Sequence, residues 1–139
     1  MIVDFAFLAD SAEAVNGKIY VIGGAIDTVW AKQVPLLHPH LTFVLKLIFD
    51  VAEIGRKHKL EIQIMDEDCI IIANVGGDIE IPAKNPNIPK GWQQSSIAVL
   101  NFQNLNFSKF GSYSFNILVN NSSLKSIPLR LAQHIEIPK

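Results

Sequence analysis

The 139-residue chain has one cysteine, no long hydrophobic run and almost no net charge. A single thiol, Cys69, cannot form an internal disulfide, and Met1 is not followed by the basic segment and apolar run of a secretory signal, so we expect a reducing, cytoplasmic location. The longest strongly apolar stretch, residues 41–49, contains Lys46 and is far shorter than the roughly 20 residues of a membrane-spanning helix. We therefore expect no membrane segment.

Charge of either sign is also scarce. Twelve Lys and Arg residues against thirteen Asp and Glu residues give a net charge of −1, which produces no overall field to attract nucleic acid or an anionic membrane. We expect neither as a partner. Hydrophobic residues make up 49% of the chain and charged residues 18%, a composition that excludes disorder and favours a surface that contacts another protein.

Apolar and polar residues alternate through most of the chain, which is the pattern of half-buried β-strands. In residues 111–120, Tyr113, Phe115, Ile117 and Val119 share one face. The turn-forming residues 120–123 then lead into a returning strand, so this region predicts a hairpin. Shorter runs predict further strands within residues 2–8, 18–22, 25–30, 41–49, 60–64, 70–81 and 95–107.

These elements predict an all-β fold of about eight or nine strands in a single domain, residues 1–139. The best fit is a two-sheet antiparallel β-sandwich of Greek-key, immunoglobulin-like or C2-like type. Tyr113 fits a tyrosine corner, in which the ring is buried and the hydroxyl binds backbone. The spacing of Asp10 and Glu13 is that of a capping box and predicts one helical turn.

Several segments resemble a family of small bacterial proteins of unknown function: residues 17–24, 38–41, 58–62, 66–68 and 111–115. The resemblance spans most of the chain. It implies a compact all-β domain and supplies no catalytic residue. In that family the acidic turn tends to be followed by Gly, whereas Cys69 follows Asp68 here.

Two groups of residues are candidates for metal binding. His38 and His40 lie two positions apart, so in a strand both rings project from one side, although the alternative is a strand entrance fixed by Pro39. Asp66 and Asp68 have the oxygen ligands that calcium prefers, but they lack the regular spacing of a calcium loop, and the alternative is a turn with solvated charges.

No motif for catalysis is present, so we expect a protein that is not an enzyme and needs no cofactor. Cys69 borders an Ile-rich strand and three acidic residues, which favours a buried, inert thiol. The basic cluster at residues 56–59 has no interleaved aromatic residues and predicts a solvated connection between strands.

The Pro-rich segment 82–94 predicts a long surface loop that carries Trp92 beside Pro89 and Lys90. Such an aromatic residue serves as an anchor for a partner or folds back as a lid over the end of the sandwich. Trp30 continues a strand pattern and predicts core or sheet-edge packing.

The leading hypothesis is a non-catalytic protein-interaction module that binds a protein partner, or itself as a homo-oligomer, through a sheet edge or the loop 82–94. The alternatives are a small-ligand or metal-binding sandwich that uses His38, His40 and carboxylates at its rim, which includes an enzyme, and a structural component of a phage-like or secretion assembly.

Overall fold

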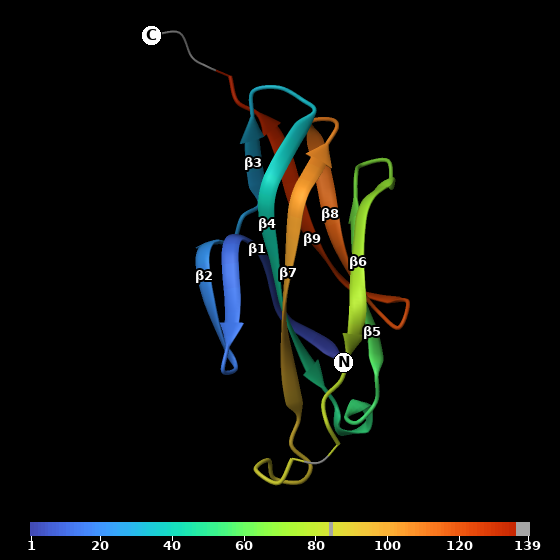
Figure 1. Cartoon of the computed structure of the whole chain (residues 1–139). Coiled ribbons are helices and arrows are strands. Elements are labelled where there is room, and N and C mark those ends of the chain that lie inside the picture. Colours follow the sequence, from blue (N-terminus) through green and yellow to red (C-terminus); the bar gives the residue numbers. More distant parts are fainter. Residues whose placement is uncertain (84, 136–139) are drawn as a thin grey trace.

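A computed structural model describes residues 1–83 and 85–135. They form two packed β-sheets, so the prediction of an all-β sandwich is confirmed (Figure 1). The described residues contain one turn of 3-10 helix, Val51–Glu53, and these strands: β1 (Ile2–Val15), β2 (Lys18–Gly24), β3 (Thr28–Ala31), β4 (Leu36–Phe49), β5 (His58–Met65), β6 (Ile71–Ile79), β7 (Gln94–Phe107), β8 (Gly111–Val119) and β9 (Ser122–Gln133).

The strands divide unequally between the two sheets. Sheet A has the order β2-β1-β4-β7, and sheet B has the order β3-β9-β8-β5-β6. Strand pairs are antiparallel, as predicted, with one exception among the described residues: β3 runs parallel to β9, with Thr28 opposite Arg130. The exception arises because the chain leaves sheet A after β2 and crosses to sheet B, a change of direction for which Gly23 and Ala25 both adopt positive φ.

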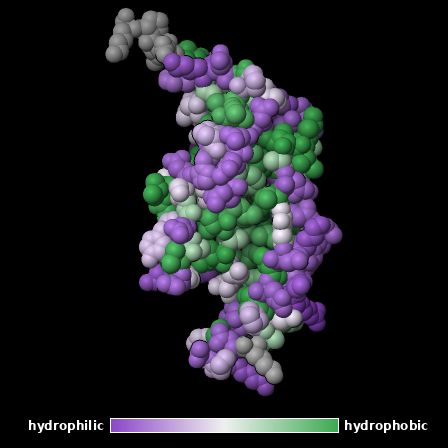
Figure 2. Space-filling model, viewed as in Figure 1, coloured by the Kyte–Doolittle hydropathy of each residue, from purple (hydrophilic) through white to green (hydrophobic). Residues whose placement is uncertain are grey.

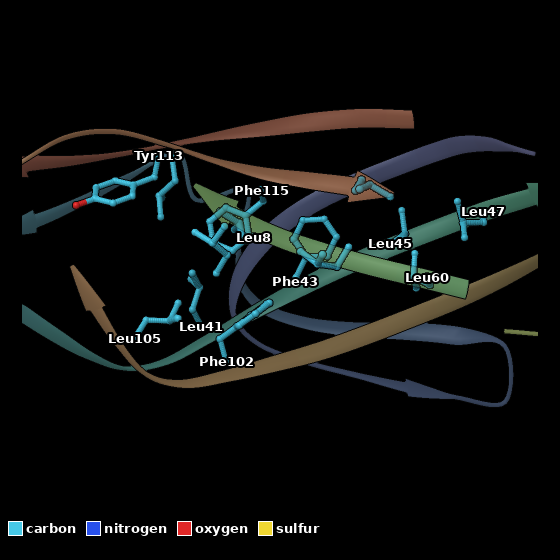
Figure 3. Packing of buried hydrophobic residues seen from close by; sticks show 14 of the residues in the cluster. Leu8, Leu41, Phe43, Leu45, Leu47, Leu60, Phe102, Leu105, Tyr113 and Phe115 are labelled. Carbon is cyan, nitrogen blue, oxygen red and sulfur yellow. The ribbon is translucent and has the colours of Figure 1, made fainter. Parts of the chain in front are cut away.

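The space between the sheets is filled by hydrocarbon side chains (Figure 3). Phe43 on β4 stacks on Phe115 of β8, with ring centroids 5.9 Å apart, and both rings are fully buried. The odd-numbered residues of β4 face the core as predicted: Leu41, Phe43, Leu45, Leu47 and Phe49 are at most 1% exposed. Burial of this apolar surface is the main source of stability for the sandwich.

Tyr113 forms the expected tyrosine corner. Its ring is buried against Phe107, with centroids 4.9 Å apart, and its hydroxyl donates a 2.6 Å hydrogen bond to the backbone oxygen of Lys109. Burial of the hydroxyl raises the pKa of Tyr113. The corner ties the start of β8 to the turn that precedes it.

The predicted helical turn at Asp10–Glu13 is wrong, because these residues continue β1. Asn16 and Gly17 both have positive φ, at 52° and 73°, the geometry of a tight hairpin turn whose twist matches the flanking strands. The turn places Ser11 opposite Ile22 and Glu13 opposite Tyr20. Cross-strand backbone hydrogen bonds therefore take the place of the local capping interactions that the spacing suggested.

No helix in the part of the chain that the structure describes has the length and hydropathy needed to cross a bilayer.

Candidate functional site

A two-stranded arm, residues 10–24, extends from sheet A. Ala9 is the last β1 residue paired with β4 and the first paired with β2, so beyond Ala9 the strand β1 has only β2 beside it. Figure 1 shows this hairpin in blue at the side of the sandwich. An isolated two-stranded hairpin is only marginally stable in water, so an arm of this kind gains stability from further contacts.

The arm exposes apolar side chains. Tyr20 is 60% exposed and Ile22 is 73% exposed, and Val15 and Val21 are also exposed. Residues 11–13 and 19–22 together line a shallow hollow of about 520 Å³ on the hairpin. The four consecutive residues 19–22 are all apolar, whereas a strand with one solvated face would alternate.

Gly23 shapes the end of the arm next to the sheet. It has a φ of 64°, and a Cβ there would collide with the Asp10 carboxylate, which lies across from it on β1. A glycine is therefore required both by backbone conformation and by the close approach of Asp10.

The outer face of sheet A, the side away from the core, is largely apolar. Phe7, Val44 and Val99 lie opposite one another across β1, β4 and β7, and the next row contains Phe5, Lys46 and Ile97. The rings of Phe5 and Phe7 stack with centroids 5.9 Å apart. The Nζ of Lys46 lies 3.4 Å from a carboxylate oxygen of Asp4. Figure 2 shows hydrophobic residues across the middle of the molecule, over β4 and β7.

The outer face of sheet B is mostly polar. The residues of β5, β6, β8 and β9 that alternate with the core positions include Lys59, Glu61, Gln63, Asn74, Asp78, Ser112, Asn116, Ser126 and Arg130. Lys59 and Glu61 form an ion pair of 2.9 Å on this face, and Asn74 donates to Glu61 at 3.4 Å. This face is suited to water, whereas the apolar side chains named on the outer face of sheet A are buried or half-buried.

The loop 82–94, apart from Lys84, which lies outside the described residues, is a surface loop as predicted, and β7 begins at its last residue. Trp92 is 63% exposed, so the interpretation of its ring as a lid over the sandwich end is wrong. The amide of Trp92 donates to the backbone oxygen of Pro89, and Lys90 lies within this turn. Trp92, Val51, Ile54 and Ile88 help to line a shallow hollow of about 200 Å³.

The structure separates His38 from His40. His38 is paired with Leu105, which is buried in the core, whereas His40 is paired with Gln103 and its Nε2 lies 3.1 Å from the Thr42 hydroxyl on the outer face. The expectation that both rings project from one side is therefore wrong. Asn104 on β7 lies opposite Pro39 on β4 and has a φ of 54°. On the two sides of this irregular position, opposite faces of β4 and β7 are turned toward the core.

The acidic turn 66–68 anchors the β5–β6 hairpin to the start of β8. Lys109 Nζ lies 3.6 Å from an Asp66 carboxylate oxygen and 2.5 Å from one of Asp68, and Glu67 accepts a 2.6 Å hydrogen bond from the Ser112 amide. We call these contacts the turn anchor. The hydrogen bond from the Ile70 amide, with those from Asp68 and Lys109, lowers the pKa of Asp66 below its usual value.

The turn anchor uses the carboxylates that were proposed as calcium ligands. Asp66 also accepts hydrogen bonds from two backbone amides of its own turn, at 2.9 and 3.0 Å. Across residues 1–83 and 85–135, no three side chains of His, Cys, Asp or Glu gather closely enough to hold a metal ion. Metal binding at Asp66 and Asp68 therefore stays a prediction, because no group of three ligands is present among the described residues.

Cys69 is exposed, so the prediction of a buried thiol is wrong. It follows the acidic turn 66–68 with a φ of 60°, a conformation that favours glycine, and its backbone amide donates to the backbone oxygen of Asp66 at 3.1 Å. Trp30 lies on the edge strand β3 and is 66% exposed, so edge placement is confirmed and core packing is wrong.

The basic residues 56–59 do not form one exposed charged patch, because His58 is buried. His58 is buried, its Nε2 lies 2.9 Å from the backbone oxygen of Glu53, and its Nδ1 lies 3.0 Å from the side-chain nitrogen of Asn120. The side-chain nitrogen of Asn120 can only donate, so the Nδ1 of His58 accepts and its Nε2 carries the proton that the backbone oxygen of Glu53 accepts. His58 therefore has a structural role at the start of β5.

Sequence reasoning placed strands at residues 2–8 and 18–22 but missed the arm that joins them. The available signal was the run of apolar residues at 19–22 immediately after the Asn16-Gly17 turn. A strand with apolar residues on both faces is typical of a buried position. The order of the strands shows that β2 is an edge strand, because β1 is its one neighbouring strand among the described residues.

The chain belongs to a family of unknown function, DUF6941, whose model matches residues 4–132. No curated protein matches the sequence.

Two glycoside hydrolases are among the solved structures that part of this chain matches. One is a glycosyl hydrolase family 2 member from Bacteroides cellulosilyticus DSM 14838, at 12% identity and a TM-score of 0.37, in which the match covers 68% of this chain and 13% of that one. The other is a beta-glucuronidase from glycoside hydrolase family 2, at 17% identity and a TM-score of 0.36, with 69% and 10% covered. The chain thus spans a small part of either enzyme.

Proposed function

We propose that this protein is a non-catalytic interaction module that binds an extended strand of a protein partner along the free edge of β2. The observation that carries the proposal is the arm, residues 10–24, whose outer strand presents Tyr20 and Ile22 at 60% and 73% exposure. An edge strand offers a row of backbone donors and acceptors to a partner, and its side chains supply specificity.

The chemistry of the surface supports a protein partner. The outer strand of the arm has a single charged residue, Lys18, at its first position, and interfaces are depleted in charge and enriched in aromatic residues at their centre. The exposed apolar residues are contiguous along one strand, which distinguishes them from the single exposed apolar residues that are normal on any protein.

A second candidate surface is the loop 82–94, because Trp92 is exposed beside Pro89 and Lys90 and lines a shallow hollow. Aromatic anchors of this kind often dominate binding energy. The further hypothesis of a structural component in a phage-like or secretion assembly relies on the same edge strand, since such components pack edge to edge.

The test is affinity capture from an extract of the source cells with three versions of the full chain. We expect Ile22→Lys to lose the partners that the unaltered chain captures, because a lysine on an edge strand opposes strand addition. Trp92→Ala should retain them. Capture that survives Ile22→Lys and is lost with Trp92→Ala would contradict binding at β2 and assign it to the loop.

A further inference from the structure

We propose that the strand that binds along β2 is β2 of a second copy of this chain, paired antiparallel across a two-fold axis. Sheet A of one copy and sheet A of the other then form one continuous sheet. This inference rests on the proposed function, because it names the partner of the edge described there.

The other edges of the two sheets each carry a feature that discourages pairing, whereas in β2 such features, Lys18 and the pair Gly23-Gly24, lie at its two ends. β3 has four residues, β6 contains Gly76, Gly77 and the charged Asp78, and β7 is irregular at Asn104, where φ is 54°. Short length, charge and irregular backbone are the devices that protect edge strands. Within β2, residues 18–22 contain neither proline nor an inward charge, and the positive φ of Gly23 lies beyond them.

Two-fold symmetry fixes the register. An antiparallel pair with a two-fold axis perpendicular to the sheet has one residue opposite its own copy, and Val21 is the central residue of β2. With Val21 opposite Val21, the regular residues 20–22 pair directly, with Tyr20 opposite Ile22 of the second copy, and Lys18 lies beside the Gly23-Gly24 end of that copy. The contact between an aromatic and a β-branched side chain, formed twice by symmetry, is a favourable cross-strand pair.

The charges of the arm are compatible with this register. Glu13 lies beside Tyr20 within the hairpin, and Lys18 lies beside Val15. Lys18 meets a glycine of the second copy, and the two Lys18 residues lie at opposite ends of the shared pair, so no like charges face each other. Two copies of the arm can therefore face each other without repulsion between like charges, which an interface between two identical surfaces requires.

The composition also favours a second copy over a different protein. Interfaces between identical chains are more apolar than those of transient complexes, and the arm presents Tyr20, Val21 and Ile22 without a charge among them. The whole chain has a net charge of −1 and therefore exerts no strong field on an oppositely charged partner, or on itself.

The first experiment is sedimentation velocity with the full-length chain over a wide range of concentration. We expect a monomer–dimer equilibrium whose dissociation constant rises at least about tenfold in Ile22→Lys, because the added charge is placed against Tyr20 of the second copy. Trp30→Lys is the matched control: it puts the same charge at a residue of another edge strand that is 66% exposed, against 73% for Ile22. It should leave the constant unchanged, and circular dichroism should show that both variants are folded.

The second experiment tests the register by cross-linking. In a Cys69→Ser background, Val21→Cys should form a disulfide-linked dimer on air oxidation, because residues directly opposite each other in an antiparallel pair have Cα atoms about 4.5–5.5 Å apart, within disulfide range. Ile19→Cys should not, because it lies opposite Gly23. A dimer that is weakened by Ile22→Lys but cross-links better through Ile19→Cys would overturn this register.

Failure of the inference differs from failure of the proposed function. A chain that stays monomeric at every concentration, or a dimer unaffected by Ile22→Lys, would overturn pairing between two copies of β2. If capture from extract still depended on Ile22, the edge would bind a strand of another protein. If neither dimerisation nor capture changed with Ile22→Lys, both proposals would be wrong.

Discussion

Two hairpins, β1–β2 and β5–β6, differ in what their turns contact. The β5–β6 turn is held to the start of β8 by the turn anchor, in which Lys109 contacts Asp66 and Asp68 and Glu67 binds the Ser112 amide. The β1–β2 turn at Asn16-Gly17 lies at the far end of an arm with exposed apolar residues. One hairpin completes the fold, and the other is available to a partner.

The difference lies in what each hairpin packs against. β5 lies between β6 and β8, and its residues Leu60, Ile62 and Ile64 are buried in the core. The arm contributes no residue to that core cluster. Loss of the arm should therefore affect association, whereas loss of the turn anchor should affect stability.

Gly111→Ala should give the largest effect. Gly111 has a φ of 134°, and a Cβ there would collide with the Glu67 carboxylate, which is itself bound to Ser112. We expect the free energy of unfolding to fall by about 1–3 kcal/mol, measured by urea denaturation. Ser126→Ala, an exposed position on the neighbouring β9, is the control and should change it by less than about 0.5 kcal/mol. An unchanged midpoint for Gly111→Ala would mean that the turn anchor does not contribute to stability.

Gly23→Ala should act on the arm alone. The positive φ and the approach of Asp10 cost about 1–2 kcal/mol locally, but Asp10 is exposed and able to rotate away. Hydrogen exchange should show faster exchange of amides in residues 10–24, with little change in global unfolding. A fall in global stability as large as that of Gly111→Ala would contradict the separation of the two hairpins.

Acid should weaken the anchored hairpin. Hydrogen bonds from the Ile70 and Asp68 amides and the nearby Lys109 lower the pKa of Asp66 in the folded state. The resulting stabilisation is present above the ordinary Asp pKa of about 4 and is lost as the pH falls through the lower folded value. Denaturation from neutral pH to below pH ~3 should show a smaller acid-induced loss for Asp66→Asn than for the unaltered chain. Parallel curves would exclude this role for Asp66.

The smallest expected effect is a gain. Cys69 has a φ of 60° at an exposed position, where glycine avoids the strain of a side chain, although glycine also has more freedom when unfolded. Cys69→Gly should leave stability unchanged or raise it by up to about 1 kcal/mol. Cys69→Ala, which keeps the Cβ, is the matched control and should give no gain. A clear loss of stability in Cys69→Gly would show that the thiol makes a contact of its own.

The period-2 patterns were enough to predict the core, because residues such as Phe43 and Phe115 are placed by alternation alone. The helical turn at Asp10–Glu13 was wrong because pairing with β2, a tertiary interaction, outweighed a local capping pattern. The exposure of Cys69 was missed because the apolar strand beside it suggested burial, although the Gly that tends to occupy this position in the resembling family is a signal of a left-handed turn residue. The arm could not be predicted either, because an apolar strand at an edge and one in a core have the same composition.

In the dimer that we propose, β2 is the edge that binds a second copy of the chain. Hydrogen exchange measured by mass spectrometry at low and high protein concentration tests it at the residues concerned. We expect amides in residues 18–24 to become more protected as concentration rises, while those in residues 60–64, in the interior strand β5 of sheet B, stay the same. Exchange in residues 18–24 that does not change with concentration would contradict it.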